Sequence, residues 1–172
     1  MVEVLELSKE DQDWLRKAAA LDALAWREEF GVEHDRTALI CESNVFRYRP
    51  LLKPLEVRIG AGYQLRDVLR LQLAAIITGS PVRFSSAEPL SDTGISVDVI
   101  SDAAFAREIQ HNPGTRIRTL GEVDESLYVA AVESSSVVLD QPVLADGRRE
   151  LLPFLLEQAV ATTMHRFGVI NK

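Results

Sequence analysis

The most constraining feature of the sequence is a strand–helix–strand unit near its centre. Leu55–Ile59 alternates as a β-strand, and Gly60-Ala61-Gly62 follows it as a tight turn. Residues 64–78 then carry aliphatic side chains at helical spacing, and a glycine and a proline end this helix before a second strand at 82–84. Such a βαβ unit of about thirty residues joins two parallel strands by a right-handed crossover.

A second cycle of the same kind follows. Residues 95–100 alternate as a strand, residues 102–110 have the pattern of a helix, and residues 116–120 again have that of a strand. A short helical turn at 122–125 leads to residues 127–132, which predict one more strand. We therefore predict an α/β protein with a Rossmann-like, mostly parallel sheet and crossover helices.

The N-terminal region predicts one amphipathic helix. Ser8 and Asp11 have the spacing of a capping box, which satisfies free N–H groups at a helix start. Apolar side chains recur on one face of the segment, and Gly31 stands where a left-handed C-cap would end the helix. Trp14 and Trp26 on or beside this face indicate a surface that docks on a neighbouring domain, which we favour over ligand stacking.

β-prone segments lie on both sides of the central units. Residues 45–50 alternate as a strand with Arg47 and Arg49 on one side, which suits a solvated face or acidic partner groups better than an anion site. Asp146-Gly147 predicts a type I′ turn, and a hairpin there needs a surface to lie on. The predicted divisions are an N-terminal helix and loop (1–43), a Rossmann-like domain (44–136), a C-terminal β-hairpin flap (137–156) and a tail (157–172).

The composition excludes several classes of partner. A formal net charge of −7 without a run of Lys or Arg argues against binding to nucleic acid or to an anionic membrane. The N-terminus lacks the pattern of a signal peptide, and no apolar stretch is long enough to anchor the chain in a membrane. With a single cysteine, the chain forms no internal disulfide, so we expect a cytoplasmic protein.

Motifs for chemistry are incomplete. Gly60 and Gly62 lie at a strand-to-helix turn, where amides can cradle a pyrophosphate, but Leu65 replaces the third glycine of G-x-G-x-x-G. We favour a glycine-eased turn and keep both glycines as weak cofactor-binding candidates. Cys41 lacks an activating neighbour in sequence. The three histidines, His34, His111 and His165, lack the spacing of a metal site. The sequence therefore predicts no catalytic residue, metal or cofactor in this chain.

The end of the central unit resembles a known family. Residues 73–88 are similar to the aldehyde dehydrogenase stretch A-A-L-x-A-G-N-x-V-V-x-K-P-S-E, part of that family's NAD-binding domain. The resemblance places Ser85 where the family has a lysine that contacts the adenosine ribose, and Ser86 at the following proline. A hydroxyl does not replace this cationic donor. The family's E-L-G-G motif and nucleophilic cysteine have no counterpart here.

Four further runs carry a more specific resemblance. They are Glu42–Pro50, Ser85–Leu90, Glu150–Val160 and His165–Gly168, of which the last two are the most distinctive. From Leu7 to Gly168 the chain resembles the C-terminal segment of actinobacterial proline utilization A proteins. These are bifunctional enzymes that combine proline dehydrogenase with L-glutamate γ-semialdehyde dehydrogenase. Here the chain begins with its own Met1, which fits either an excised segment or a free-standing paralogue.

This resemblance implies an aldehyde-dehydrogenase-like module that has lost catalysis. In the family it packs on the dehydrogenase domain, imitates with its flap the dimerisation of ordinary aldehyde dehydrogenases, and helps to close the aldehyde site and substrate tunnel. The implied flap is Val137–Leu156 and the implied closing tail is Glu157–Gly168. The parent enzyme would use NAD and FAD, and a homodimer through the flap is a further expectation. The implied interdomain contacts are Leu151, Leu152, Phe154, Arg166, Phe167 and Gly168.

Other functions stay open at this point. A degenerate nucleotide-binding sensor would use Gly60, Gly62 and the start of the following helix. A stand-alone interaction module would use the hairpin. An enzyme of unknown chemistry would need Cys41 as its most obvious reactive group.

Overall fold

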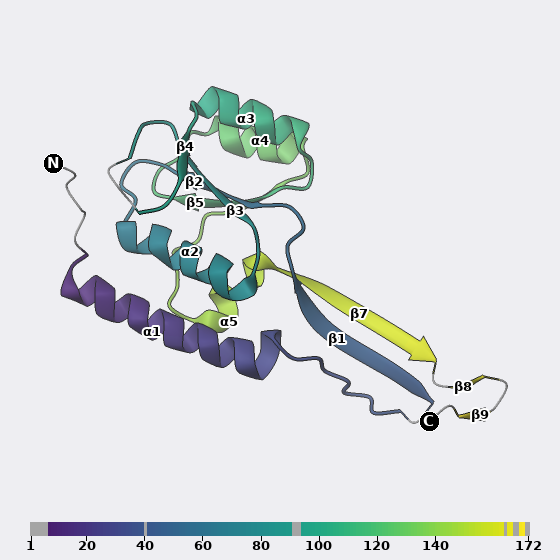
Figure 1. The fold of residues 1–172 in the computed structure, drawn as a ribbon. Helices are drawn as coiled ribbons and strands as arrows, with labels where there is room; N and C mark the ends of the chain where they lie inside the picture. Colours follow the sequence, from purple (N-terminus) through teal and green to yellow (C-terminus); the bar gives the residue numbers. More distant parts are fainter. Residues whose placement is uncertain (1–6, 40, 91–93, 164, 167–168, 171–172) are drawn as a thin grey trace.

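The body of the protein is built on a five-stranded parallel sheet. The computed structural model describes residues 7–39, 41–90, 94–163, 165–166 and 169–170 (Figure 1). The order β4-β3-β2-β5-β6 reverses between β2 and β5, which is the switch point where open α/β sheets bind ligands. This topology confirms the predicted Rossmann-like fold. The strands are β2 (Leu55–Ile59), β3 (Val82–Ser86), β4 (Val97–Val99), β5 (Arg116–Leu120) and β6 (Val137–Leu139).

The central βαβ unit forms as the pattern predicts. Strands β2 and β3 pair in parallel along all five residues of each. Helix α2 (Leu65–Thr78) joins them and ends at Gly79, whose left-handed φ of 67° is readily adopted by a residue without a Cβ. Leu71, Ala74 and other aliphatic side chains of α2 are completely buried against the sheet. The crossover helix therefore supplies much of the larger core.

Helices cover both faces of the sheet. Helices α1 (Lys9–Ala25), α2 and α5 (Gly147–Glu150) lie on one side, and α3 (Asp102–His111) and α4 (Ser126–Glu133) lie together on the other (Figure 1). The larger core is formed with α2, and the smaller core is formed by Phe105, Ile109, Ile117 and their neighbours from α3, α4 and β5. This three-layer arrangement leaves the carboxyl ends of the strands open between the layers.

The strand predicted at 127–132 is wrong, because this segment is helix α4. Leu127, Ala130 and Ala131 are buried at helical spacing, and they pack in the smaller core with α3. Val129 and Val132 lie on the outer side of the same helix. Short apolar runs rich in valine do not distinguish a strand from a helix by periodicity, and the tertiary contact with α3 decided the outcome.

The hairpin predicted at Asp146-Gly147 is also wrong. Asp146 caps α5 by accepting a hydrogen bond from the Arg149 amide at 3.2 Å, and a one-turn 3-10 helix (Leu152–Phe154) follows. A Cβ on Gly147 would lie 2.5 Å from the carbonyl oxygen of Leu21, so this glycine permits close contact with α1 rather than a turn. Residues 137–139, at the start of the predicted flap, belong instead to the parallel sheet as β6.

An antiparallel ribbon exists, but distant segments form it. Strand β1 (Glu42–Pro50) pairs with β7 (Leu155–Thr163) along all nine residues of each, and the ribbon projects away from the body (Figure 1). The Tyr48 ring contacts Phe30 and Phe46 edge-on, with centroids 4.8 and 5.2 Å away. The contact with Phe30 joins the base of the ribbon to the helical turn that follows α1. The short strands β8 (His165–Arg166) and β9 (Val169–Ile170) form a further antiparallel pair.

The predicted N-terminal helix forms, but it ends differently. The Ser8 hydroxyl accepts a hydrogen bond from the Asp11 amide at 3.1 Å and caps α1. A π-helical turn, η1 (Trp26–Phe30), extends the helix, and Gly31 has φ −88° instead of a left-handed conformation. A Cβ on Gly31 would lie 2.8 Å from the Trp26 carbonyl oxygen, so the glycine serves this close contact.

Candidate functional site

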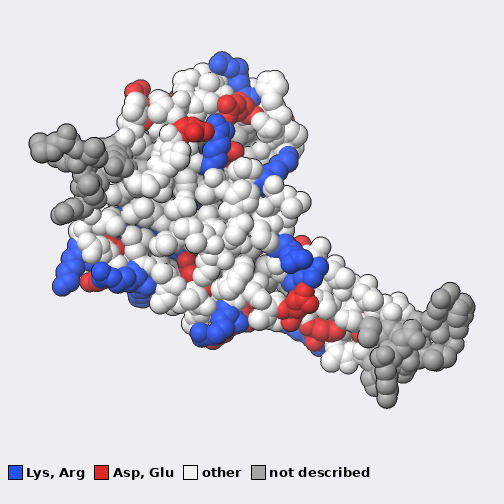
Figure 2. All heavy atoms as spheres, in the orientation of Figure 1, with Lys and Arg blue, Asp and Glu red and all other residues white. Residues whose placement is uncertain are grey.

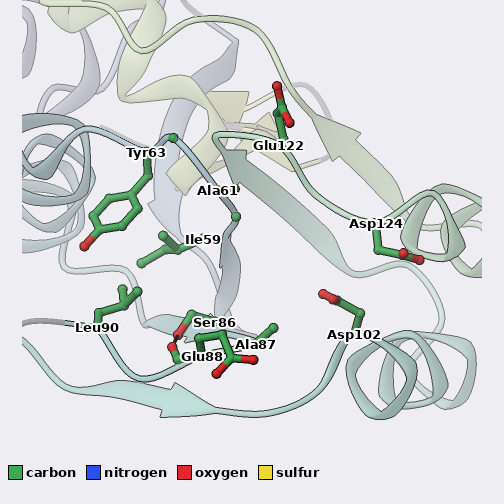
Figure 3. Close-up of a pocket in the computed structure, with 12 residues that line it drawn as sticks. Ile59, Ala61, Tyr63, Ser86, Ala87, Glu88, Leu90, Asp102, Glu122 and Asp124 are labelled. Atoms are coloured by element: carbon green, nitrogen blue, oxygen red, sulfur yellow. Dashed lines mark hydrogen bonds between the residues drawn. The ribbon is translucent and has the colours of Figure 1, made fainter.

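A mouth opens at the carboxyl ends of β2 and β3, where a Rossmann-like sheet binds its ligand. Its volume is about 340 Å³, and its walls come from the turn after β2, the segment after β3 and the loop between β5 and α4. Figure 3 shows Tyr63 and Leu90 at one end of the mouth and Asp102 and Asp124 at the other. This position makes the mouth the first place to test for a dinucleotide site.

The predicted glycine turn borders this mouth, but two of its backbone amides already donate hydrogen bonds to carbonyls of the chain. The Gly60 amide donates to the Leu120 carbonyl at 2.7 Å, and Ala61 and Glu122 exchange two backbone hydrogen bonds of 3.0 and 2.8 Å. A Cβ on Gly60 would overlap the carbonyl of Glu122. Gly60 is therefore needed for the close crossing of two loops, and neither its amide nor that of Ala61 remains for a phosphate.

Gly62 has a different role in the same turn. Its φ of +73° is the left-handed conformation, and an added Cβ would meet no atom within 4 Å. The glycine therefore relieves backbone strain in the turn rather than making room for a neighbouring group. Of the two weak cofactor-binding candidates, only Gly62 faces open space.

The charges at the mouth are unfavourable for a dinucleotide. Glu88, Asp102, Glu122 and Asp124 line it, and its lining residues include no Lys, Arg or His. Hydrogen bonds from the Ser126 side chain and amide hold the pKa of Asp124 below its ordinary value, so this carboxylate is ionised at neutral pH. A pyrophosphate at this position would meet carboxylates where a nucleotide site supplies donors.

The sequence interpretation missed a buried arginine, Arg58, which pairs with one of these carboxylates, Asp102. Arg58 on β2 is 1% exposed, and its guanidinium donates to Asp102 at 2.6 Å and to the Ile100 carbonyl at 2.9 Å. The same group lies 4.8 Å from the centre of the Phe105 ring. A charged residue within a strand of the predicted parallel sheet was the available sequence signal.

The serine at the family's lysine position is buried. Ser85 is inaccessible, and its hydroxyl accepts a long hydrogen bond of 3.4 Å from Arg58. Ser86 is 1% exposed, and its hydroxyl donates to the Glu88 carbonyl at 2.5 Å. Both hydroxyls are thus engaged in contacts within the chain at the place where the resemblance puts a ribose contact.

The other candidate chemical groups lie apart from the mouth. Cys41 is exposed in the segment before β1, and His111 is at the end of α3, where its Nδ1 lies 2.7 Å from the Arg107 carbonyl. The His34 Nε2 lies 3.0 Å from the Glu29 carbonyl, and His165 is in β8. Within the described ranges, no three His, Cys, Asp or Glu residues are grouped so that they could hold a metal ion.

The residues expected at an interdomain contact separate into three groups. Leu151 and Phe154 are fully buried in this chain's own larger core, whereas Leu152 is 42% exposed. Arg166 belongs to β8. Phe167 and Gly168 lie outside the described residues. Among the apolar candidates that the structure describes, only Leu152 presents its side chain to the surface.

The β1–β7 ribbon offers a larger surface. Beyond its first two residues, β7 is exposed except at Val160, and its outer residues are mainly small or uncharged. The Arg47 guanidinium donates hydrogen bonds to Glu33 at 2.6 Å and to Gln158 at 2.7 Å. This arginine is therefore paired within the chain, as a partner of an acidic group and not as an anion site. Figure 2 shows the charged side chains gathered near the base of the ribbon. The loop before β1 runs beside the ribbon: His34 and Phe46 exchange backbone hydrogen bonds of 2.9 and 2.8 Å, and the Asn44 amide donates to Asp35 at 3.1 Å.

The chain is similar to part of a protein of solved structure. Over 99% of its length the chain matches 16% of proline utilization A (PutA) from Corynebacterium freiburgense, with 43% sequence identity and a TM-score of 0.70. The chain thus spans about one sixth of that protein. No protein-family model and no curated protein matches the chain. No helix among the described residues is long and apolar enough to span a membrane.

Proposed function

Because this chain is related over nearly its whole length to a segment of proline utilization A, we propose that it acts as a non-catalytic C-terminal domain of a bifunctional proline-catabolic enzyme. It packs on the NAD-dependent L-glutamate γ-semialdehyde dehydrogenase domain and helps to close the aldehyde site and substrate tunnel. The parent enzyme binds NAD and FAD, and this chain binds neither. Its catalytic residues lie outside this chain.

The projecting β1–β7 ribbon is the observation that carries this proposal. An isolated two-stranded ribbon is only marginally stable in water, yet this one extends nine residue pairs from the body. The outer edge of β7 pairs with no strand among the described residues. A strand with a free edge and small side chains can lie closely against another domain.

The contact surface that we propose combines the ribbon with the tail that follows it. Ala159 and Ala161 share one side of β7, and both are exposed. Their small side chains let another backbone approach this side. Leu152, at the root of β7, adds an exposed apolar group. Arg166, Phe167 and Gly168 follow β7 in the sequence, and we include them in the proposed surface.

Complementation tests the proposal directly. The chain is mixed with a proline utilization A dehydrogenase truncated before the matching segment, and binding and semialdehyde oxidation are measured. We expect the wild-type chain to bind and to raise the activity. No binding and no gain in activity at high micromolar concentration would refute the proposed function.

A pair of matched variants locates the contact. Ala161→Arg places a long cation on the exposed side of β7, and we expect it to weaken binding about tenfold or more through a clash and an uncompensated charge. Ala103→Arg makes the same change at an exposed site on α3 and should bind as the wild type does. Equal binding by both variants would remove the ribbon from the interface.

A further inference from the structure

Helix α4 presents an apolar face to solvent. Tyr128, Val129 and Val132 are 39%, 58% and 81% exposed, and they lie on one side of a helix of eight residues. The opposite side, with Leu127 and Ala130, is buried in the smaller core. Clustered aliphatic exposure of this kind, unlike a single exposed leucine, marks an interaction surface.

The segment around α4 holds nearly all of the chain's net charge. Residues 119–147 contain six carboxylates and no Lys, Arg or His, so they account for six of the seven net negative charges. Glu122 and Asp124 line the mouth immediately before α4, Glu125 precedes its first residue, and Glu133 is its last. The apolar face is therefore flanked by acidic groups along the chain at both ends of the helix.

One carboxylate at each end of α4 is held by a hydrogen bond within the chain. Asp124 accepts a hydrogen bond from the Ser126 amide at 2.9 Å. The backbone of Glu122 pairs with that of Ala61 in the wall of the mouth. At the other end, Glu133 accepts a hydrogen bond from Gln110 at 2.7 Å. The carboxylates of Asp124 and Glu133 thus have a defined position relative to the three exposed side chains.

We propose that α4 and the loop before it form a docking surface for a basic, apolar protein segment. Aliphatic side chains of the partner cover Val129 and Val132, and its Lys or Arg side chains lie near Glu122, Asp124 and Glu125. The adjacent mouth, of about 340 Å³, has room for one long cationic side chain. Complementary charge selects a cationic partner and rejects nucleic acid and anionic lipid. This surface lies on α4, away from the ribbon, and does not depend on the proposed function.

Nuclear magnetic resonance with a model peptide tests this surface. The probe is a 14-residue amphipathic helix of Leu and Lys, titrated into the ¹⁵N-labelled chain. A Leu and Glu peptide of the same length is the control. We expect amide shifts confined to residues 121–133, weaker binding as salt rises from 50 to 300 mM, as screening requires, and no shifts with the Glu peptide. Shifts centred elsewhere, equal shifts with both peptides, or no binding at millimolar concentration would overturn the proposal.

Variants separate the apolar and charged contributions. Val129→Ser with Val132→Ser should weaken peptide binding about tenfold, and Glu125→Gln with Glu133→Gln should weaken it severalfold and reduce its salt dependence. The matched control is Ile76→Ser, on α2 in the opposite layer, where the exposed fraction is 66%. The surface over α2 is almost free of charged side chains (Figure 2). If Ile76→Ser weakens binding as much as the α4 pair does, the proposal is wrong.

Discussion

At the scale of single residues, the structure changes the meaning of the glycines near the mouth. Gly60 looks in sequence like part of a phosphate cradle, but it lies where a loop from β5 crosses the turn after β2. The absence of a Cβ therefore serves a contact between two backbones. The same absence at Gly62 serves only the backbone conformation.

Substitution by alanine distinguishes these two roles. Gly60→Ala should lower the free energy of unfolding by about 2–4 kcal/mol, because its Cβ overlaps the Glu122 carbonyl and the loops must separate. Gly62→Ala should cost about 1 kcal/mol, the strain of a positive φ alone. Denaturant unfolding measures both. A Gly60→Ala chain as stable as Gly62→Ala would contradict the proposed crossing.

Glu56 gives the chain a specific pH dependence. Burial raises its pKa above the ordinary value of 4.5, and Arg83 only partly opposes this. The folded chain therefore holds this proton to a higher pH than the unfolded chain does, and stability is lost as pH rises from about 4.5 through the folded pKa. The Glu56→Gln chain has no ionisable group at this position, so it lacks this contribution to the pH dependence of stability.

The expected result is a stability difference that changes with pH. From pH 4 to 7, the wild type should lose stability relative to Glu56→Gln, as followed by thermal unfolding. Arg83 retains Asp98 and Glu108 at 2.8 Å in the variant, so its charge stays paired. Glu125→Gln, at an exposed site, controls for general loss of charge. A constant difference across this range would exclude the proposed titration.

At the scale of elements, buried ion pairs join the helices on one face of the sheet. Arg70 of α2 donates two hydrogen bonds to Asp22 of α1, at 2.8 and 2.7 Å, and a third to the Leu144 carbonyl at 3.0 Å. Glu150 of α5 accepts from the Leu144 amide at 2.7 Å. These contacts fix the segment before α5, which leads into the ribbon.

Breaking this pair should be costly. Asp22→Asn leaves a fully buried guanidinium without its counter-charge, and we expect a loss of about 3–5 kcal/mol in the free energy of unfolding. Asp22→Leu combined with Arg70→Met should cost clearly less than the sum of the single changes. The control is Asp13→Asn, whose pair with Arg16 is exposed and should matter by less than about 1 kcal/mol. Additive single and double variants would argue against a coupled pair.

At the scale of the whole molecule, the sheet retains the topology of a nucleotide-binding fold. Its mouth, however, is lined by carboxylates, and the amides of Gly60 and Ala61 donate to carbonyls of the chain itself. We therefore expect NAD, NADH and ATP to produce no heat of binding up to millimolar concentration in titration calorimetry. Dissociation constants in the micromolar range would show that the mouth still holds a nucleotide. The Gly62→Ala chain would then locate the site.

Much of this architecture can be predicted from the local pattern. The crossover unit from β2 to β3, the capped start of α1 at Ser8, and the helix α3 followed by β5 are each specified by short-range periodicity and capping residues. The sequence also shows that Leu65 replaces the third glycine of the phosphate-binding motif that begins at Gly60. The acidic residues after β5 are visible in the sequence, although their position at the mouth is not.

Local pattern alone could not decide the rest. Residues 127–132 became a helix because Leu127 and Ala130 found the side chains of α3, and Gly147 serves a contact with Leu21 that lies far away in the sequence. The ribbon pairs β1 with β7, more than one hundred residues apart, and the sequence of neither strand indicates which strand it pairs with. The sequence by itself determined the α/β class and the parallel core, since these follow from hydrophobic spacing. Only the tertiary structure decided the pairing of the ribbon strands, the hydrogen bonding of the glycine-turn amides and the ion pairs of the buried arginines. Each of these depends on contacts between groups that are distant in the sequence.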